Sequence, residues 1–585
     1  MSGSTEPVPD DLEDIFGFKA AKERLEQGTK LTIQNPDNKN DASFIKHRVF
    51  MNCVDSFNSR YIAAVNQIYG ASRIIGMDEA QGEEEANQNM EVIPQNKYEV
   101  IGTMQFGFHK PTEDILFTLS DEDEEKFHVE LLKCGYIIYD ITQNPDEIKK
   151  AINTLNFLEA EIEKIKEIGP KTFSRLEEER IFILISTVMT WGKTKPLNPR
   201  DPTLAYTESK YKKRKAHPNY EDHIACEREV VLRGRKDKDH LKTYVVCSGI
   251  VYGEEELDLT PIFKLAWLNE SYLPCFYPGT NSVPLIHVGD LARVLHKLMD
   301  INPGTPQYIL AVEPSPTSLK KILVALSKAL GSGRTKNVSQ AEAFLYNEFN
   351  QRFFDLCTLD IRMEPEFVSD ALQVDWQTEL NIAQNMKRIA EQFVIKRHLI
   401  SKKIILHGPP ASGKTRLAKM LAEKYGLHYI SIATMIEDIV ENLRNNIEDE
   451  QLRLEEARER AKEKEILEKD DEDEEIDEEE MEEEDVGGNI EEWEEQIREI
   501  RVVFKESPDQ KIPDEMVIRL LRSYLLQNKC QYQGYVIDGY PKTYQQAERV
   551  WDIHRTSSLD PVRLSLIRRI LDVQNTPIQA KPDWV

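Results

Sequence analysis

The chain has 585 residues, 40% of them hydrophobic, and a formal net charge of −28 at pH 7. It is too long for one hydrophobic core, because domains usually stop growing at about 250 to 300 residues, so two or three domains are predicted. The acidic balance argues against nucleic acid or an anionic membrane as a general partner, because both reward Lys and Arg.

Two further features of the composition concern the compartment. The seven cysteines are odd in number and contain no CxxC pair, so neither a disulfide framework nor a zinc site is indicated. The longest apolar run, residues 181–191, is much shorter than a bilayer span, and the first residues are acidic and polar. We expect a soluble protein of the cytosol.

The N-terminal half of the chain has the pattern of an α/β domain. Residues 1–45 lack apolar periodicity and predict a flexible leader. Within 46–333, continuous Ile, Val and Phe runs such as 136–141 and 244–248 alternate with helical patterns such as 146–168. Such runs are typical of a parallel sheet buried on both faces. We therefore expect a Rossmann-like, doubly wound sheet.

The C-terminal half predicts a second α/β unit. Residues 334–400 have the pattern of a connecting helical region, and the second unit covers 401–552. Its insertion, 448–500, is dominated by charged residues, and the block 470–485 alone holds 14 acids and no base. Because like charges repel, we expect a solvated, largely disordered insertion. Residues 553–585 form a divergent tail.

A glycine-rich phosphate loop opens the second unit. Residues 408–415 satisfy GxxxxGK[ST] between an apolar strand and a helix, which is the context that the mechanism requires. Its backbone N–H groups can surround phosphate oxygens, while Lys414 would reach the terminal phosphates and Thr415 could hold Mg²⁺. The predicted nucleotide-binding residues are Gly408, Pro409, Pro410, Ala411, Ser412, Gly413, Lys414, Thr415 and Arg416.

A second motif follows a later strand of this unit. The apolar run 534–537 ends in Asp538, and the sequence then turns through Gly-Tyr-Pro-Lys-Thr into a helix. Asp538 should lie at the carboxyl edge of the sheet, where a carboxylate can orient the magnesium shell. The two segments together resemble the adenylate kinase family, whose members join such a loop to a DG(F/Y)P(R/K)T segment and a Gln-Ala pair. The resemblance implies a P-loop nucleoside-monophosphate-kinase module.

The resemblance also implies the reaction and the residues that serve it. The reaction is ATP + AMP to two ADP, with ATP and Mg²⁺ as ligands and AMP or another nucleoside monophosphate as partner. Lys414, Asp538 and Lys542 would serve catalysis, and Thr415 and Asp538 would hold the metal. The implied acceptor residues are Ser431, Gly539, Lys542 and Gln546, of which Gln546 would contact the acceptor adenine.

The module departs from the family at several positions. Ile432 and Glu437 stand where the family has a Thr and an Arg that hold the monophosphate, and Lys542 replaces an Arg, which loses a planar grip on phosphate. After residue 548 the family continues through two more strands and an arginine-bearing lid, and 549–585 match neither. We hypothesise that the module is truncated and transfers phosphate poorly or not at all.

The N-terminal unit resembles the extended short-chain dehydrogenase/epimerase family in three segments, 183–187, 244–253 and 283–292. That family needs a glycine-rich turn after the first strand, and residues 52–59 contain no glycine. It also needs a YxxxK pair, and four residues after Tyr220 stands Ile224. We interpret the unit as a degenerate NAD(P)-binding scaffold, in which Ser186 and Tyr220 are structural.

The order of these parts resembles that of a cilium-associated branch of the adenylate kinase family. This resemblance implies a place in the cytoplasm and in the axoneme of a cilium or flagellum, with axonemal proteins as partners. Two functions remain open: a kinase that supports nucleotide homeostasis there, and a non-catalytic axonemal scaffold or nucleotide-binding protein. An NAD-dependent epimerase is a third hypothesis, which the missing residues disfavour.

Overall fold

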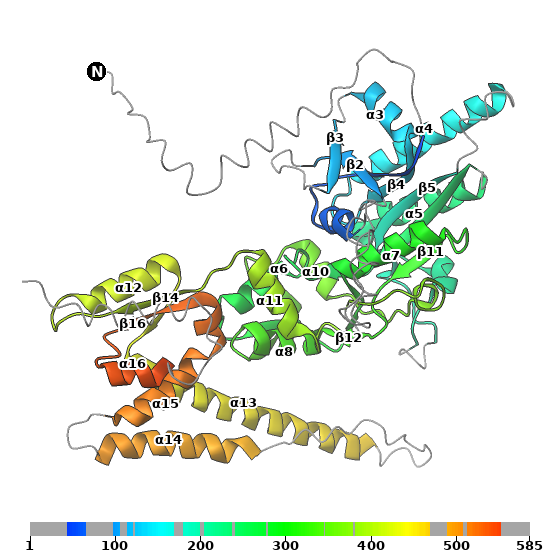
Figure 1. Ribbon diagram of the computed structural model, residues 1–585. Helices are drawn as coiled ribbons and strands as arrows, with labels where there is room; N and C mark the ends of the chain where they lie inside the picture. The colour runs from blue at the N-terminus through cyan, green and yellow to red at the C-terminus, as the bar shows by residue number, and fades with distance from the viewer. Residues whose placement is uncertain are drawn as a thin grey trace, which may run out of the picture. The chain divides into compact units, whose positions relative to one another are not determined.

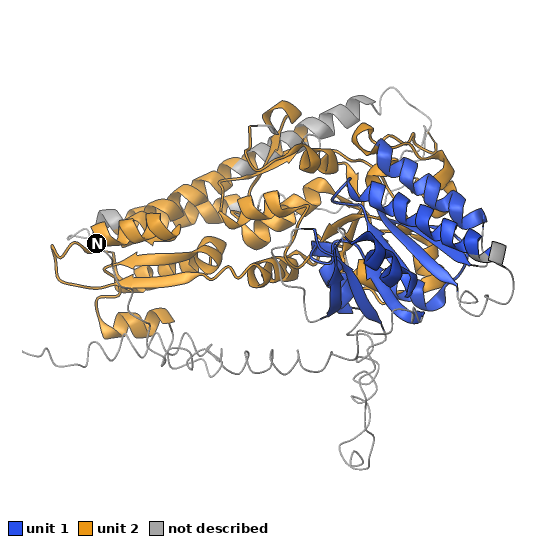
Figure 2. Cartoon of the chain, turned by 90° about the horizontal axis from the view of Figure 1, so that it is seen from above, with its two compact units in different colours: residues 1–186, 221–247, 295–309 blue, residues 187–220, 248–294, 310–585 orange. Residues whose placement is uncertain are grey.

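A computed structural model describes most of the chain and divides it into two compact units, which Figure 2 colours separately. The first unit comprises residues 1–186, 221–247 and 295–309, and the second unit comprises 187–220, 248–294 and 310–585. The described residues are 44–65, 98–105, 114–120, 123–168, 179–198, 204–236, 240–276, 279–343, 345–377, 381–467, 488–506 and 512–551. The predicted leader, up to residue 43, and the tail from 552 lie outside them.

A seven-stranded sheet organises the N-terminal half, in the order β11-β6-β5-β4-β1-β2-β3 (Figure 1). The neighbours from β3 through β2, β1 and β4 to β5 are parallel. The order reverses between β1 and β4, as in a doubly wound fold, so the predicted architecture is confirmed. The strands are β1 (Ile45–Met51), β2 (Glu99–Thr103), β3 (Ile115–Leu119), β4 (Cys134–Asp140), β5 (Arg180–Thr187), β6 (Leu241–Ser248) and β11 (Tyr308–Ala311).

The burial of the central strands explains the continuous apolar runs. Every residue of β4 and β5 is buried, as both faces of a parallel sheet require. The predicted crossover helix is α4 (Glu147–Ile168), and it packs beside α5 (Glu221–Lys236). α3 (Glu124–Leu132) leads from β3 into β4. Sequence patterns missed β3, whose alternating burial marks it as a short edge strand.

A second lobe surrounds three two-stranded sheets within the second unit. Residues 334–400, expected to be a connection, belong to this lobe, because β13 pairs in parallel with β8 and α11 packs on α8. The paired strands are β7 (Ile250–Tyr252) with β10 (Leu285–His287), β9 (Ser282–Val283) with β12 (Thr317–Ser318), and β8 (Leu273–Phe276) with β13 (Thr335–Val338). The helices are α6 (Thr260–Trp267), α8 (Leu319–Leu330), α9 (Gln340–Ala343), α10 (Gln351–Cys357) and α11 (Met386–Lys396). α7 (Val288–Ile301) begins in the second unit and continues into the first from Leu295.

The C-terminal module has a three-stranded parallel sheet in the order β14-β16-β15. Alternate residues of its strands face opposite sides, so α12 covers one face through Ala418 and Val536, while α13, α15 and α16 enclose a larger core around Ile537. The strands are β14 (Lys402–Leu406), β15 (His428–Ile430) and β16 (Gly534–Asp538), and the helices are α12 (Lys414–Tyr425), α13 (Ile432–Leu467), α14 (Gly488–Glu506), α15 (Asp514–Leu525) and α16 (Tyr544–Trp551).

The charged insertion is more ordered than its composition suggests. α13 continues to Leu467 and α14 begins at Gly488, so the prediction of a largely disordered 448–500 is wrong for both flanks. The physical reason is a hydrophobic stripe, because Ile500 joins the core of the module and Val503 packs against it. The acidic block lies in 468–487, outside the described residues.

The helices also bear on the membrane question. Within the described ranges, no helix combines the length and the apolar character that a membrane crossing needs.

Candidate functional site

The glycine loop lies at the carboxyl end of β14, where α12 begins. Gly413 precedes α12 with φ +82°, a left-handed conformation that side chains with a Cβ rarely adopt. A Cβ on Gly408 would lie 3.0 Å from Ser412 Oγ. Residues 408–413 are all exposed. The loop therefore has the tight, open backbone that a phosphate cradle needs.

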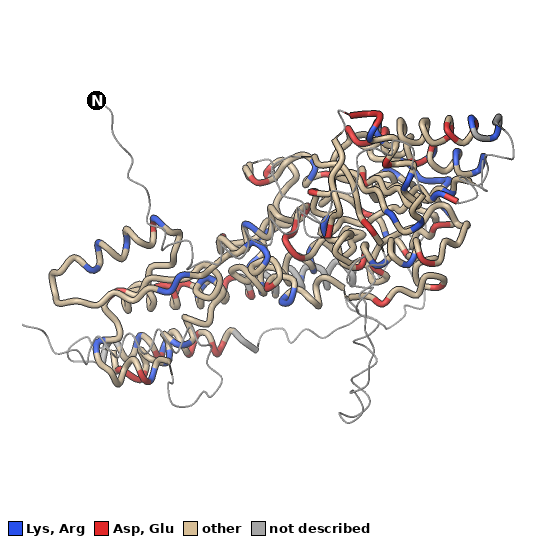
Figure 3. Tube along the Cα trace, turned by 45° about the horizontal axis from the view of Figure 1, so that its top comes forward, with Lys and Arg blue, Asp and Glu red and all other residues tan. Residues whose placement is uncertain are grey.

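Lys414 is the first residue of α12, and its ammonium group lies over the loop. Its Nζ donates a hydrogen bond of 2.8 Å to the carbonyl oxygen of Pro409. The helix carries further positive charge at Arg416, Lys419 and Lys424 against one acid, Glu423, and Figure 3 shows the lysines and arginines in blue. Basic side chains and the positive end of the helix both favour an anion at the loop.

Asp538 ends β16 beside the loop and receives hydroxyl groups from two other elements. Thr415 Oγ1 of α12 donates to Asp538 Oδ2 at 2.6 Å, and the phenol of Tyr429 in β15 donates to the same oxygen at 3.0 Å. A hydroxyl next to a carboxylate fits Mg²⁺, which prefers oxygen ligands and is often bound through one or two carboxylates. The two predicted metal ligands are therefore adjacent, although 123 residues separate them in the sequence.

The turn after Asp538 brings the second motif against the first. Gly539 has φ +69°, and its N–H donates to Leu406 O at 3.0 Å. A Cβ at this position would lie 3.7 Å from Cε of Lys414. That distance is an ordinary contact, so the left-handed φ, and not a lack of space, is the reason for a glycine here. Lys542, farther along the turn, has an exposed side chain.

The predicted acceptor residues Ser431 and Gln546 make internal hydrogen bonds. Ser431 directly precedes α13, and its Oγ accepts from the N–H of Thr434 at 3.1 Å. The Oε1 of Gln546 accepts from the N–H groups of Lys542 and Thr543, and its Nε2 donates to Asp514 Oδ2 at 2.9 Å. Both side chains stabilise the starts of helices, so contact with a base would require Gln546 to exchange these partners.

Ala411 occupies a strained position within the loop, with φ +63°. A left-handed conformation costs a residue with a Cβ about 1 to 2 kcal/mol, which glycine avoids. We expect Ala411→Gly to raise the free energy of unfolding of the module by about 0.5 to 1 kcal/mol, after the entropy that glycine adds to the unfolded chain.

Urea unfolding of the whole chain measures this effect. The matched control is Ala418→Gly, because Ala418 is fully buried within α12 and its replacement should lower stability by about 1 kcal/mol or more. A loss of stability in both variants would contradict strain at Ala411.

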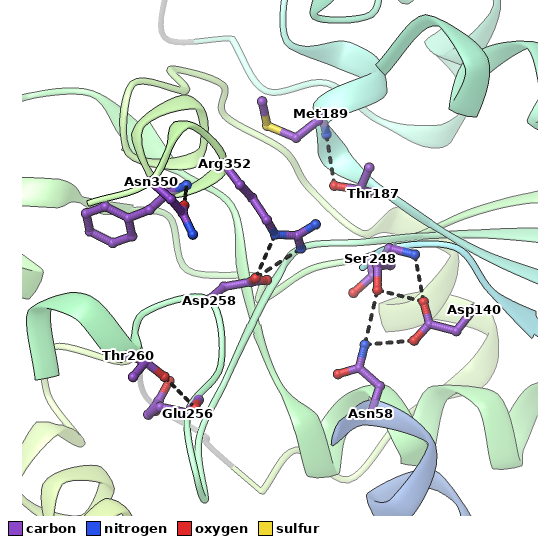
Figure 4. A network of polar contacts seen from close by, with 12 residues as sticks. Asn58, Asp140, Thr187, Met189, Ser248, Glu256, Asp258, Thr260, Asn350 and Arg352 are labelled. Atoms are coloured by element: carbon purple, nitrogen blue, oxygen red, sulfur yellow. Dashed lines mark hydrogen bonds and ion pairs between the residues drawn. The ribbon is translucent and has the colours of Figure 1, made fainter. Parts of the chain in front are cut away.

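Buried polar side chains lie at the switch point of the N-terminal sheet, between β1 and β4. Asn52 Nδ2 donates to Asp140 O at 2.9 Å and to Glu147 Oε2 at 3.0 Å. Asn58 Nδ2 donates to Asp140 Oδ2 at 2.9 Å (Figure 4). All four residues are buried. A doubly wound sheet binds a dinucleotide at this point, and here these side chains form hydrogen bonds within the chain itself.

Tyr220 has surroundings that do not suit a catalytic phenol. It ends a short 3₁₀ turn and is only 6% exposed. Burial raises its pKa, whereas a general base of this type needs a pKa near the working pH. The positive charge of Arg352 lowers the pKa of Tyr220, but less than burial raises it. The guanidinium group donates its hydrogen bonds to Asp258 (Figure 4). These contacts agree with a structural role for Tyr220.

Comparison with known proteins relates both halves of the chain to one group. The model of the Hydin adenylate kinase-like domain matches residues 403–507. Adenylate kinase 7 of Mus musculus is 33% identical over 422 residues, which are 72% of this chain and 63% of that protein. The chain is homologous to adenylate kinase 7. The protein of that name from Macaca fascicularis is 32% identical over 341 residues, or 58% of this chain and 59% of its own length.

The homology to adenylate kinase 7 covers only part of those relatives. The chain spans about three fifths of their length. Among solved structures, dTDP-glucose 4,6-dehydratase from Bacillus anthracis matches 60% of this chain and 97% of its own, with 10% identity and a TM-score of 0.40. Because that score is low, the assignment of the N-terminal fold rests on its strand order.

Proposed function

We propose that the C-terminal module binds ATP with Mg²⁺ and transfers phosphate by the adenylate kinase reaction, ATP + AMP to two ADP. The observation that carries this proposal is the hydrogen bond of 2.6 Å between Thr415 and Asp538, beside Lys414 and the glycine loop. It brings the hydroxyl of the loop motif to the carboxylate of the second motif, as a magnesium-nucleotide site requires.

The residues of the site suit phosphoryl transfer, which depends on positioning and positive charge more than on covalent chemistry. The N–H groups of the loop would bind phosphate oxygens, and Lys414 would move from Pro409 to the terminal phosphates. Thr415 and Asp538 would hold Mg²⁺, which when bound neutralises charge on the phosphates. Lys542 would bring a point charge to the acceptor phosphate, without the two-point grip of an arginine.

The acceptor side of the module supports a weak reaction. Glu437 is exposed on the second turn of α13, and Asp514 begins α15. Arg549 on α16 is paired with Glu515 at 3.1 Å. An AMP phosphate approaching this side would meet acidic groups, which disfavour an anion.

This acidic acceptor side favours a second candidate, a non-catalytic nucleotide-binding protein or axonemal scaffold. In either case we propose the cytoplasm and the axoneme of a cilium or flagellum as its location, with axonemal proteins as partners. The catalytic candidate would supply or buffer adenine nucleotides there. This cellular part of the proposal rests on the family resemblance.

Reversing the charge on the acceptor side should improve AMP binding. We expect the double variant Ile432→Thr with Glu437→Arg to bind AMP about tenfold more tightly, because a hydrogen bond to a charged group contributes about 1.5 to 3 kcal/mol. Calorimetric titration with AMP measures the change. Glu441→Arg, an exposed charge reversal one turn later on α13, is the matched control. An equal increase in AMP affinity in the control would show that any added positive charge on α13 attracts AMP, and that the acceptor site has no specific part in it.

A coupled assay of ADP formation by the whole chain separates the two candidates. The kinase proposal predicts slow ADP formation that depends on AMP and is lost in Asp538→Asn. ATP binding without any AMP-dependent turnover would overturn the kinase in favour of the nucleotide-binding scaffold.

A further inference from the structure

One tyrosine outside both sequence motifs contacts the carboxylate of the candidate metal site. Tyr429 is the middle residue of β15 and lies opposite Val536 of β16 in the parallel register. Its phenol donates to Asp538 Oδ2 at 3.0 Å, and Thr415 Oγ1 donates to the same oxygen at 2.6 Å. One carboxylate oxygen therefore receives two hydroxyl groups, from the strand and from the helix that flank it.

The ring of Tyr429 is fixed by its neighbours. It packs against a small core that includes Ala418 of α12 and Val536 of β16. Lys419, one helical turn after Thr415, places its Nζ 5.6 Å from the centre of the ring, within the range of a cation–π contact. Because the ring is held on two sides, its hydroxyl has a defined position relative to Asp538.

The two hydroxyl groups on Asp538 have different relations to a bound nucleotide. In a phosphate loop of this type, the hydroxyl at the position of Thr415 is a magnesium ligand. A hydroxyl binds a metal through an oxygen lone pair and keeps its proton, so Thr415 can still donate to Asp538 in that state. The phenol of Tyr429 has no such role at the metal, and its proton serves Oδ2 alone. Among the described residues no hydrogen bond is seen at Oδ1, so that oxygen can face the metal or its water shell.

We propose that Tyr429 is a positioning residue, which holds Asp538 in the orientation needed for Mg²⁺. This inference rests on the proposed function, because it requires that the module bind a magnesium nucleotide. A carboxylate held through one oxygen cannot rotate freely about its last bond, and outer partners of this kind commonly tune metal affinity. The sequence motifs do not include this residue, because its role depends on the register of β15 against β16.

The test measures how much Mg²⁺ strengthens nucleotide binding. The whole chain is titrated with a fluorescent N-methylanthraniloyl derivative of ATP, once with excess Mg²⁺ and once with EDTA. We expect Tyr429→Phe to reduce the Mg²⁺-dependent gain in affinity about 3- to 10-fold, the value of one hydrogen bond to a partly exposed carboxylate. Its affinity in EDTA should equal that of the wild type, which also shows that the loop is folded.

The matched control is Tyr425→Phe at the end of α12. The ring of Tyr425 is 47% exposed and stacks with Lys402 and Lys424, away from Asp538. This variant should keep the full gain from Mg²⁺. An unchanged or larger gain in Tyr429→Phe would overturn the inference, and so would equal weakening with Mg²⁺ and EDTA, which indicates packing alone. No binding by the wild type in either condition would overturn the proposed function and this inference with it.

Discussion

Replacing Lys414 with Ala should weaken ATP binding at least about 100-fold. The ammonium group lies 2.8 Å from the loop carbonyl of Pro409, directly at the cradle. Two or more hydrogen bonds to a triphosphate, each worth about 1.5 to 3 kcal/mol, would be lost with it. Calorimetric titration of the whole chain with ATP and Mg²⁺ measures the effect.

Lys424→Ala provides the matched control for this loss. Lys424 lies near the end of the same helix and stacks on Tyr425 at 5.7 Å. The Lys424→Ala substitution removes the same charge from α12 without touching the loop. ATP binding should therefore change by less than about threefold. Equal losses in the two variants would mean that the net charge of α12 attracts the nucleotide, and would contradict a specific role for Lys414.

Replacing Glu256 with Gln should stabilise the second lobe by about 2 to 4 kcal/mol at pH 7.5. Glu256 is 1% exposed, and burial raises its pKa to about 8. Its Oε1 accepts from the N–H of Gly253 at 2.7 Å, while Oε2 has no hydrogen-bond partner among the described residues. Gln keeps the shape and the acceptor and cannot ionise, so it avoids the free energy that Glu256 spends on taking up a proton when the chain folds at this pH.

The sign of the pH dependence follows from the raised pKa. Between about pH 4.5 and pH 8 the folded state holds a proton on Glu256 that the unfolded state releases. The free energy of unfolding of the wild type therefore falls as the pH rises through this window. The difference between Glu256→Gln and the wild type should therefore grow from near zero at pH 4.5 to a plateau above pH 8. Each pH unit in this window contributes up to about 1.4 kcal/mol.

Urea unfolding at pH 5, 6.5 and 8 measures this difference, with Glu255→Gln as the control. Glu255 is the neighbouring residue and is partly exposed. A gain in Glu256→Gln that is the same at all three pH values would show that the side chain is not protonated in the fold. A loss at pH 8 would contradict the account of its burial.

Local sequence patterns predicted the parts of this structure that depend on neighbouring residues. The phosphate loop, the helix from Lys414 and the strand ending in Asp538 were predicted because each is a short motif with its own backbone requirement. The topology of parallel strands then brought Thr415 to Asp538, since the carboxyl ends of such strands share one edge.

Features that depend on distant contacts could not be predicted in the same way. The bond from Tyr429 to Asp538 depends on the register of β15, and the buried network around Asn52 depends on residues from three elements. Composition misled us about α14, because a stripe that includes Ile500 outweighs the charges on its other faces. The region 334–400 was misjudged because its strand pairs with one about 60 residues earlier.

The most direct test of the account is calorimetric titration of the whole chain with ATP and, separately, with diadenosine pentaphosphate, both with Mg²⁺. The donor site predicts that one ATP binds per chain. Because the acceptor side is acidic, the affinity for diadenosine pentaphosphate should lie within about tenfold of that for ATP. Binding of the pentaphosphate a thousandfold more tightly than ATP would contradict the account of the acceptor side. The absence of any ATP binding would contradict the donor site itself.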